Sequence, residues 1–290
     1  MSKRILAIAL AALIGAGVAT VQAFISKPIP QLNIYKVKDD LYNIEGDGGN
    51  VAVFVTNEGV VLVDDKYDDD HDAILSQIGT VTNQPVRYVI NTHYHGDHSS
   101  GNARFLPMAE VISTANARTN ILEHKQPNAP HGVAPARIVF TDETAVFLGG
   151  KEVRARYFGR GHTNGDAIIY FPAQRTIHTG DLMAGTTPLV DYGAGGSIVE
   201  WTKTLDAAMK LDFDTVIPGH GPVTDKAALL TYRNNVEKLR NCVYGLIRQG
   251  KSQEDIRNIL MADYGWEADG VNMQWDLPGF MTELKPTRLE

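Results

Sequence analysis

Three histidines and one aspartate lie within six consecutive positions, directly after an apolar run at residues 86–90. They are His93, His95, Asp97 and His98, in the pattern H-x-H-x-D-H. A strand that ends in this pattern directs several nitrogen and oxygen ligands at one place, and imidazole with carboxylate suits zinc, iron or manganese. The alternative interpretation is a solvated polar loop, which this spacing does not favour. The sequence therefore predicts a metal site at this strand end.

Three more donors follow short apolar stretches later in the chain. His162 lies in a glycine-rich loop between two predicted strands, Asp181 follows a third strand, and His220 lies in a Pro/Gly turn after a fourth. Each of these signals is weak alone. Strand ends are nevertheless where a dinuclear site would collect the ligands that the first motif lacks, so the four motifs together are a strong signal of a metal site.

Taken in chain order, these motifs resemble those of the metallo-β-lactamase superfamily, over residues 41–223. The resemblance implies an α/β fold, a four-layer αββα sandwich with a dinuclear site at one edge between the sheets, followed here by C-terminal helices. It implies two zinc ions per chain, the first held by His93, His95 and His162, the second by Asp97, His98 and His220, with Asp181 bridging the two. It also implies that Asp64 supports the metal loop without binding metal. Thr92 and Thr163, next to two ligands, are predicted to act in the same way.

The aspartate at position 181 separates members of this superfamily. Zinc β-lactamases of the best-known subclass carry a cysteine here, whereas the only cysteine of this chain, Cys242, lies in a predicted helix far downstream. An aspartate bridge resembles the pattern of glyoxalase II, the lactonases and related hydrolases. The resemblance therefore implies hydrolase chemistry and leaves the substrate open.

The resemblance implies a metal-bridging hydroxide as the nucleophile, with Asp97 as the catalytic residue that orients it and passes a proton. A β-lactam-type cyclic amide or ester is the favoured small-molecule substrate, and a lactone or a thioester is the alternative within the same fold. An iron-dependent oxidoreductase of flavodiiron or persulfide dioxygenase type is the alternative from another class, so iron or manganese remains possible. A third class is a metal-binding module without turnover. The chain has no G-x-S-x-G motif for a serine nucleophile.

Residues 1–23 have the pattern of a signal peptide. Lys3 and Arg4 precede an apolar run at 5–21, and a small-x-small site ends at Ala23. We expect cleavage there, a periplasmic or secreted protein without stable membrane insertion, and one domain at 24–290 with a helical extension from about 223. An uncleaved anchor is the alternative. The formal net charge of −7 disfavours nucleic acid as a partner, because phosphates need a basic face.

Apolar patterning predicts the elements that position these motifs. Strands are expected at 41–44, 51–56, 60–64, 86–91, 153–157, 167–171, 176–178 and 215–217, and helices at 71–78 and 198–211. The acidic run at 68–70 and His71 are expected to be solvated, and His131, in a Pro-rich loop, is a weak candidate for a pocket residue. Loops at 66–70, 125–135 and 185–196 are expected to select the substrate.

The C-terminal region is predicted to be helical. An apolar stripe favours a helix packed on the core, with a dimer face or a lid as alternatives; it consists of Val236, Leu239, Val243, Leu246 and Ile247. A second helix is expected to begin after Ser252, with Asp255 completing a capping box. The tail beyond it contains Trp266, Trp275 and Phe280, which cover apolar surface or a partner. These helices offer a route to an oligomer.

Overall fold

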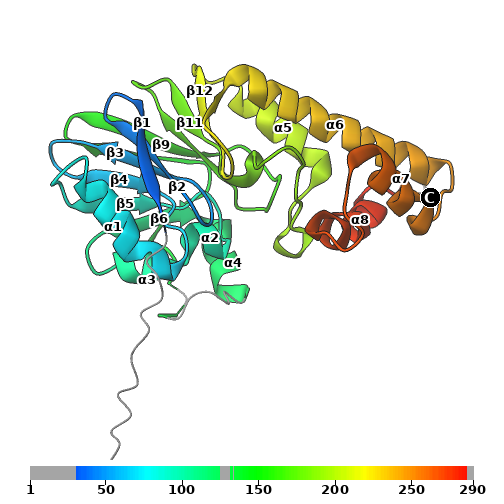
Figure 1. The fold of residues 1–290 in the computed structure, drawn as a ribbon, viewed down its shortest axis with the longest axis horizontal. Helices are drawn as coiled ribbons and strands as arrows, with labels where there is room; N and C mark the ends of the chain where they lie inside the picture. The colour runs from blue at the N-terminus through cyan, green and yellow to red at the C-terminus, as the bar shows by residue number, and fades with distance from the viewer. Residues whose placement is uncertain (1–30, 125–130, 133, 286–290) are drawn as a thin grey trace, which may run out of the picture.

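Two β-sheets lie face to face in the computed structural model, and helices cover both outer faces (Figure 1). The structure describes residues 31–124, 131–132 and 134–285. The predicted signal peptide lies outside these residues. This four-layer arrangement confirms the αββα sandwich that the sequence motifs implied.

The first sheet carries strands β1 to β7 in chain order, antiparallel up to β4 and parallel from there on. Its strands are β1 (Asn33–Lys38), β2 (Leu41–Glu45), β3 (Val51–Val55), β4 (Val60–Val63), β5 (Val86–Ile90), β6 (Glu110–Thr114) and β7 (Ile138–Phe140). Parallel neighbours end at the same edge, so the loops after β4 and β5 meet there. Both loops carry predicted site residues.

The second sheet has the strand order β13-β12-β11-β10-β9-β8. Its strands are β8 (Glu143–Leu148), β9 (Lys151–Tyr157), β10 (Ala167–Phe171), β11 (Thr176–His178), β12 (Thr215–Ile217) and β13 (Thr224–Asp225). Only β11 and β12 pair in parallel within this described sheet. The ends of these two strands therefore bring the residues after 178 and after 217 together.

Alternation along the strands explains the layering, because successive side chains point to opposite faces of a sheet. Val53 and Leu62 pack with Ile74 of helix α1 (His71–Gly79), on the outer face of the first sheet. Phe54 and Val61 point the other way, into the core between the two sheets. Strands buried on both faces are continuous apolar runs, which is why most were predictable.

Helices α5 (Ile198–Ala208) and α6 (Lys226–Arg248) cover the outer face of the second sheet. In α6, Val236, Leu239 and Val243 are buried in that core, and Leu246 and Ile247 pack against it in part. This confirms the core interpretation of the apolar stripe.

Two further helices complete the C-terminal region. Helix α7 (Gln253–Tyr264) begins after Ser252, whose hydroxyl and Asp255 form the predicted capping box. Helix α8 (Val271–Glu283) was not predicted as a separate element, because Pro278 lies inside it. Its Leu277 and Phe280 are buried in the same core as α5 and α6.

Two expectations about polar residues are wrong. Asp68 and Asp70 of the short helix η1 (Asp68–Asp70) are buried, and so is His71, whose ring packs 4.6 Å from that of Phe105. Each buried carboxylate has a partner: Asp70 accepts from the Tyr67 amide, and Asp68 pairs with His131. Pairing makes the burial of a polar run tolerable. His131 therefore lies against η1.

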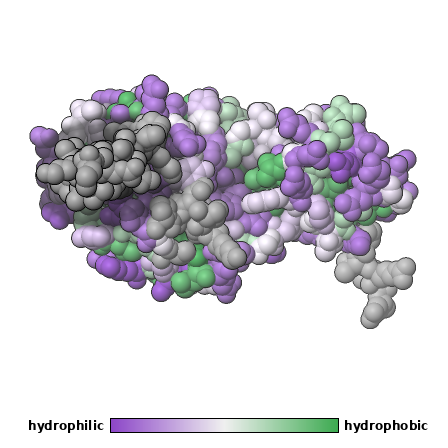
Figure 2. All heavy atoms as spheres, turned by 60° about the horizontal axis from the view of Figure 1, so that its bottom comes forward, coloured by the Kyte–Doolittle hydropathy of each residue, from purple (hydrophilic) through white to green (hydrophobic). Residues whose placement is uncertain are grey.

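The surface offers scattered apolar side chains. Figure 2 shows a mainly hydrophilic face on which the hydrophobic areas are small and separate. Large exposed apolar residues lie on different elements, such as Phe147 on β8, Leu230 on α6 and Leu122 on helix α4 (Ala115–Glu123). Isolated residues of this kind are normal on a protein surface. Within the described residues, no helix has the length and apolar character that a membrane span requires.

Candidate metal centre

The seven predicted ligands come together at the edge between the two sheets. Histidines 93 and 95 lie in the loop after β5, and Asp97 and His98 in the short helix α2 (Gly96–Ser99). From the second sheet, His162 comes from the β9–β10 loop, Asp181 from helix η2 (Gly180–Leu182) after β11, and His220 from the loop after β12. Strand ends of both sheets thus supply the site.

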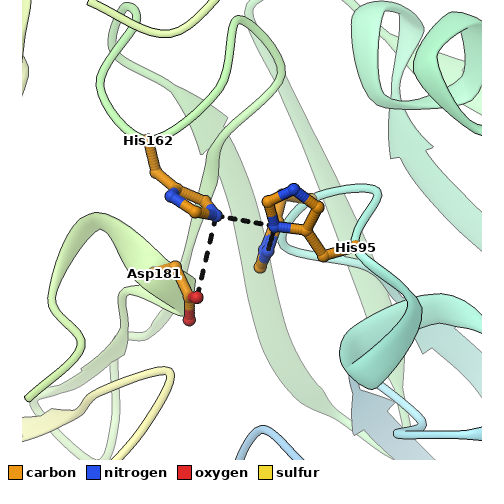
Figure 3. A group of neighbouring side chains, drawn as sticks. His95, His162 and Asp181 are labelled. Atoms are coloured by element: carbon orange, nitrogen blue, oxygen red, sulfur yellow. Dashed lines mark hydrogen bonds and ion pairs between the residues drawn. The ribbon is translucent and has the colours of Figure 1, made fainter. Parts of the chain in front are cut away.

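The ligand atoms fall into two groups, within each of which they lie no more than 4.8 Å apart. The first ligand group consists of His93, His95, His162 and Asp181, and the second of Asp97, His98 and His220. In the first group, His95 Nδ1 lies 3.1 Å from His93 Nε2 and 2.7 Å from His162 Nε2. Figure 3 shows His95, His162 and Asp181 pointing toward one another.

The second ligand group is similarly close. His220 Nε2 lies 3.1 Å from Asp97 Oδ2 and 3.3 Å from His98 Nε2. The Asp181 carboxylate reaches both groups, with Oδ1 at 3.2 Å from His98 Nε2 and Oδ2 at 3.7 Å from His162 Nε2. Asp181 is therefore in contact with both ligand groups. A Cβ at Gly219 would approach Asp181 Oδ1 to 1.9 Å, so this position requires glycine.

Four of the five imidazoles have an oxygen at the ring nitrogen that faces away from the centre. His93 Nδ1 lies 3.0 Å from Thr92 Oγ1, and His98 Nδ1 lies 2.8 Å from Asp64 Oδ2. His162 Nδ1 lies 2.5 Å from the Leu189 carbonyl oxygen. An outer acceptor takes the ring proton and leaves the inner nitrogen with a free lone pair. This donor set fits a divalent metal, because converging lone pairs repel unless a cation lies between them.

The fourth of these contacts was missed from the sequence. His95 Nε2 donates to Asp191 Oδ2 at 2.9 Å, and the Tyr94 hydroxyl donates to the same oxygen at 2.5 Å. Asp191 lies in the 185–196 loop, which was expected only to help select the substrate. No local pattern marks it, because its partner His95 is 96 positions away.

The three predicted supporting residues do not share one role: Asp64 and Thr92 contact each other and the ligand histidines, whereas Thr163 hydrogen-bonds to Asp166. Asp64 is fully buried, with φ of +64°, and accepts from the Thr92 amide at 2.7 Å and the Thr92 hydroxyl at 2.8 Å. Asp64 thus ties the strand end to His98. Thr163 instead donates to Asp166, through its amide at 3.0 Å and its hydroxyl at 2.5 Å, and so shapes the loop that carries His162. Asp166 was also missed, although it ends that loop motif.

The pKa values of the buried histidines shift in opposite directions in the two ligand groups. Burial lowers the pKa of His93 well below its usual value and that of His162 to about 4, so both rings stay neutral as metal ligands must. Burial opposes charge on His98 too, but nearby carboxylates, Asp97 foremost, outweigh it and raise its pKa. Burial would raise the pKa of Asp97, yet His98 and His220 hold it at about 2. The carboxylates therefore favour positive charge at this centre.

A pocket of about 700 Å³ opens onto the two ligand groups. His95, Asp97, His162, Asp181 and His220 all line it, so a small molecule in the pocket would reach both groups. The site is therefore a candidate metal centre at the edge of an αββα sandwich, open to a small molecule.

The chain belongs to the metallo-beta-lactamase superfamily, whose family model matches residues 44–220. Metallo-beta-lactamase IND-1 of Chryseobacterium indologenes is 25% identical over 208 residues, which cover 70% of this chain and 84% of that protein. The metallo-beta-lactamase type 2 of Bacteroides fragilis is 26% identical over 206 residues, covering 66% and 79%. A solved metallo-beta-lactamase from Pontibacter korlensis has a TM-score of 0.62 at 21% identity, covering 71% of this chain and 99% of that one.

Replacing Asp191 with alanine tests the contact that the sequence did not reveal. We expect the affinity of the first ligand group for zinc to fall about ten- to a hundredfold, as is typical when an outer partner of a ligating histidine is lost. Competition against a chromophoric chelator measures this affinity. Tyr94→Phe is the control, because it removes the other hydrogen bond to Asp191 and leaves His95 alone. Equal zinc affinity in Asp191→Ala and the wild type would contradict the assignment.

Proposed function

We propose that the protein is an exported dinuclear zinc hydrolase that cleaves a cyclic amide or ester, with a β-lactam as the favoured substrate. The observation that supports it most is the Asp181 carboxylate between two groups of ligands at the base of one open pocket. Two zinc ions bound there would supply Lewis acidity and would acidify a water molecule. Catalysis then depends on how this chain orients substrate and proton.

Asp97 is the residue that we assign to proton transfer. Its carboxylate lines the pocket and lies 3.1 Å from His220 Nε2. With a pKa of about 2 it is ionised at neutral pH, so it can accept a hydrogen bond from an attacking water and orient that water. We propose that the substrate carbonyl binds beside the first ligand group and the leaving atom beside the second, because Asp97 in the second group could then pass a proton to that atom.

The names of the relatives support a β-lactam, since each of those compared is a metallo-beta-lactamase. Asp181 supports the alternative, a lactonase or thioesterase of the same fold, because a carboxylate at this position resembles the bridge of those enzymes. The signal-like N-terminus, with its cleavage site near Ala23, supports a periplasmic or secreted location. We therefore rank a lactam above a lactone, and a lactone above a thioester.

A panel of chromogenic lactams, lactones and thioesters, given to zinc-loaded protein, tests this proposal. We expect steady-state hydrolysis of at least one cyclic substrate, with a lactam the fastest. The matched control is protein stripped of metal with a chelator, which should be inactive on the same substrate. Fast thioester hydrolysis with no cyclic substrate cleaved would reject the ranking. Inactivity across the whole panel would reject the proposed function.

A further inference from the structure

Helix α8 forms one wall of the pocket that opens onto the ligand groups. Val271, Asn272 and Trp275 line this pocket together with the ligands. The helix lies after residue 220, where the match to the family model ends. The superfamily motifs supply the ligands, and a segment of the chain beyond those motifs forms part of the pocket wall.

Trp275 is the unusual residue of this wall. Its side chain is 44% exposed, although Leu277 and Phe280 of the same helix are fully buried in the core. Val271, also half exposed, precedes it by four positions and shares its face of the helix. The indole ring lies 6.1 Å from the ring of His95, a member of the first ligand group. An exposed aromatic surface beside a polar centre suits a flat apolar group of a ligand.

Hydrogen bonds attach helix α8 to the loop whose residues accept hydrogen bonds from two of the ligand histidines. Asp276, fully buried, accepts from the Val190 amide at 2.6 Å, and Asn272 donates to the Pro188 carbonyl at 2.8 Å. At the end of the helix, Glu283 accepts from the hydroxyls of Tyr192 and Ser197. The loop thus clamped includes Leu189 and Asp191, the acceptors for His162 and His95. A surface fixed in this way needs little ordering when a ligand binds.

We propose that Trp275 is a specificity-determining residue, which selects substrates with an aromatic or other flat apolar group on the acyl side of the bond that is cleaved. We assign the contact to the acyl side because the Trp275 ring lies beside His95, which belongs to the first ligand group. That group is the one beside which we propose that the substrate carbonyl binds. The inference rests on the proposed function for its substrate class. It depends on the apolar wall and not on which cyclic bond is cleaved.

A binding experiment tests the inference without turnover. Acetate and phenylacetate present the same carboxylate to the zinc-loaded protein, and only phenylacetate carries a ring. We expect calorimetry to show about tenfold tighter binding of phenylacetate, from the area that the ring buries and its stacking. Trp275→Ala should lose this preference and bind acetate normally, whereas Trp275→Phe should keep most of it. Met261→Ala, an exposed apolar residue on α7, is the matched control.

Two results would overturn the inference: no preference for phenylacetate in the wild type, or an unchanged preference in Trp275→Ala. Equal zinc content in all variants, by elemental analysis, establishes that the centre is intact. Kinetics then extend the test, with a penicillin that carries a phenylacetamido side chain and the same nucleus with a free amine. In Trp275→Ala, KM should rise about tenfold for the first only. If the wild type cleaves neither penicillin but still prefers phenylacetate, lactam hydrolysis is rejected and the binding role of Trp275 is supported.

Discussion

Replacement of Asp181 by alanine is expected to lower turnover by at least about three orders of magnitude, which corresponds to roughly 4 kcal/mol in the activation barrier. The carboxylate contacts both ligand groups, with Oδ1 near His98 and Oδ2 near His162 and His220. Its loss removes the negative charge that holds two cations close together. The measurement is kcat on the best panel substrate, together with zinc content by elemental analysis.

The control for this variant is Asp212→Ala, an exposed aspartate that pairs with Arg175 where strands β11 and β12 begin, at the opposite end of these strands from the centre. It should leave both turnover and zinc content unchanged. Asp181→Cys is expected to keep part of the zinc, because a thiolate binds one zinc well but bridges two less readily than a carboxylate. Near-normal turnover in Asp181→Ala would show that Asp181 is not a bridge.

The second large effect is the loss of activity when the metal is removed and its recovery when zinc is added back. Apo-protein prepared with a chelator is expected to lose activity completely, and to regain it in the absence of oxygen when close to two zinc ions bind per chain. Hydrolysis needs Lewis acidity and an activated water but no change in oxidation state. Anaerobic titration with zinc, followed by activity and elemental analysis, measures both.

The outcome separates the hydrolase from the iron-dependent alternative. An iron oxygenase would require ferrous iron and oxygen, and zinc would inhibit it. Oxygen consumption that depends on iron, with no hydrolysis supported by zinc, would reject the proposed chemistry. A reproducible content of one metal or less, at full activity, would reject a dinuclear centre. In that case Asp97, His98 and His220 would contact the substrate directly and would not hold a metal ion.

Most of the core elements were predictable because their signals are local. Strands β10, β11 and β12 begin and end as predicted. β10 and β12 are mainly apolar runs bounded by polar or turn residues, whereas β11 has a single apolar residue, Ile177. The edge strand β1 was missed, because its sequence NIYKVK mixes charged and apolar residues and its burial is only partial. Helix α8 was missed as an element, since Pro278 within it indicates a break.

The sequence alone determined the candidate ligands. H-x-H-x-D-H needs only a strand end to bring four donors together, and the three remaining donors each follow a strand. Only the tertiary structure decided what surrounds them. Asp191 lies 96 positions from His95, and Asp276 lies 86 positions from Val190. Contacts of this range depend on how the sheets and helices pack, and no local periodicity records them. For the same reason the burial of Asp68 and the place of Trp275 beside His95 became visible only in the folded chain.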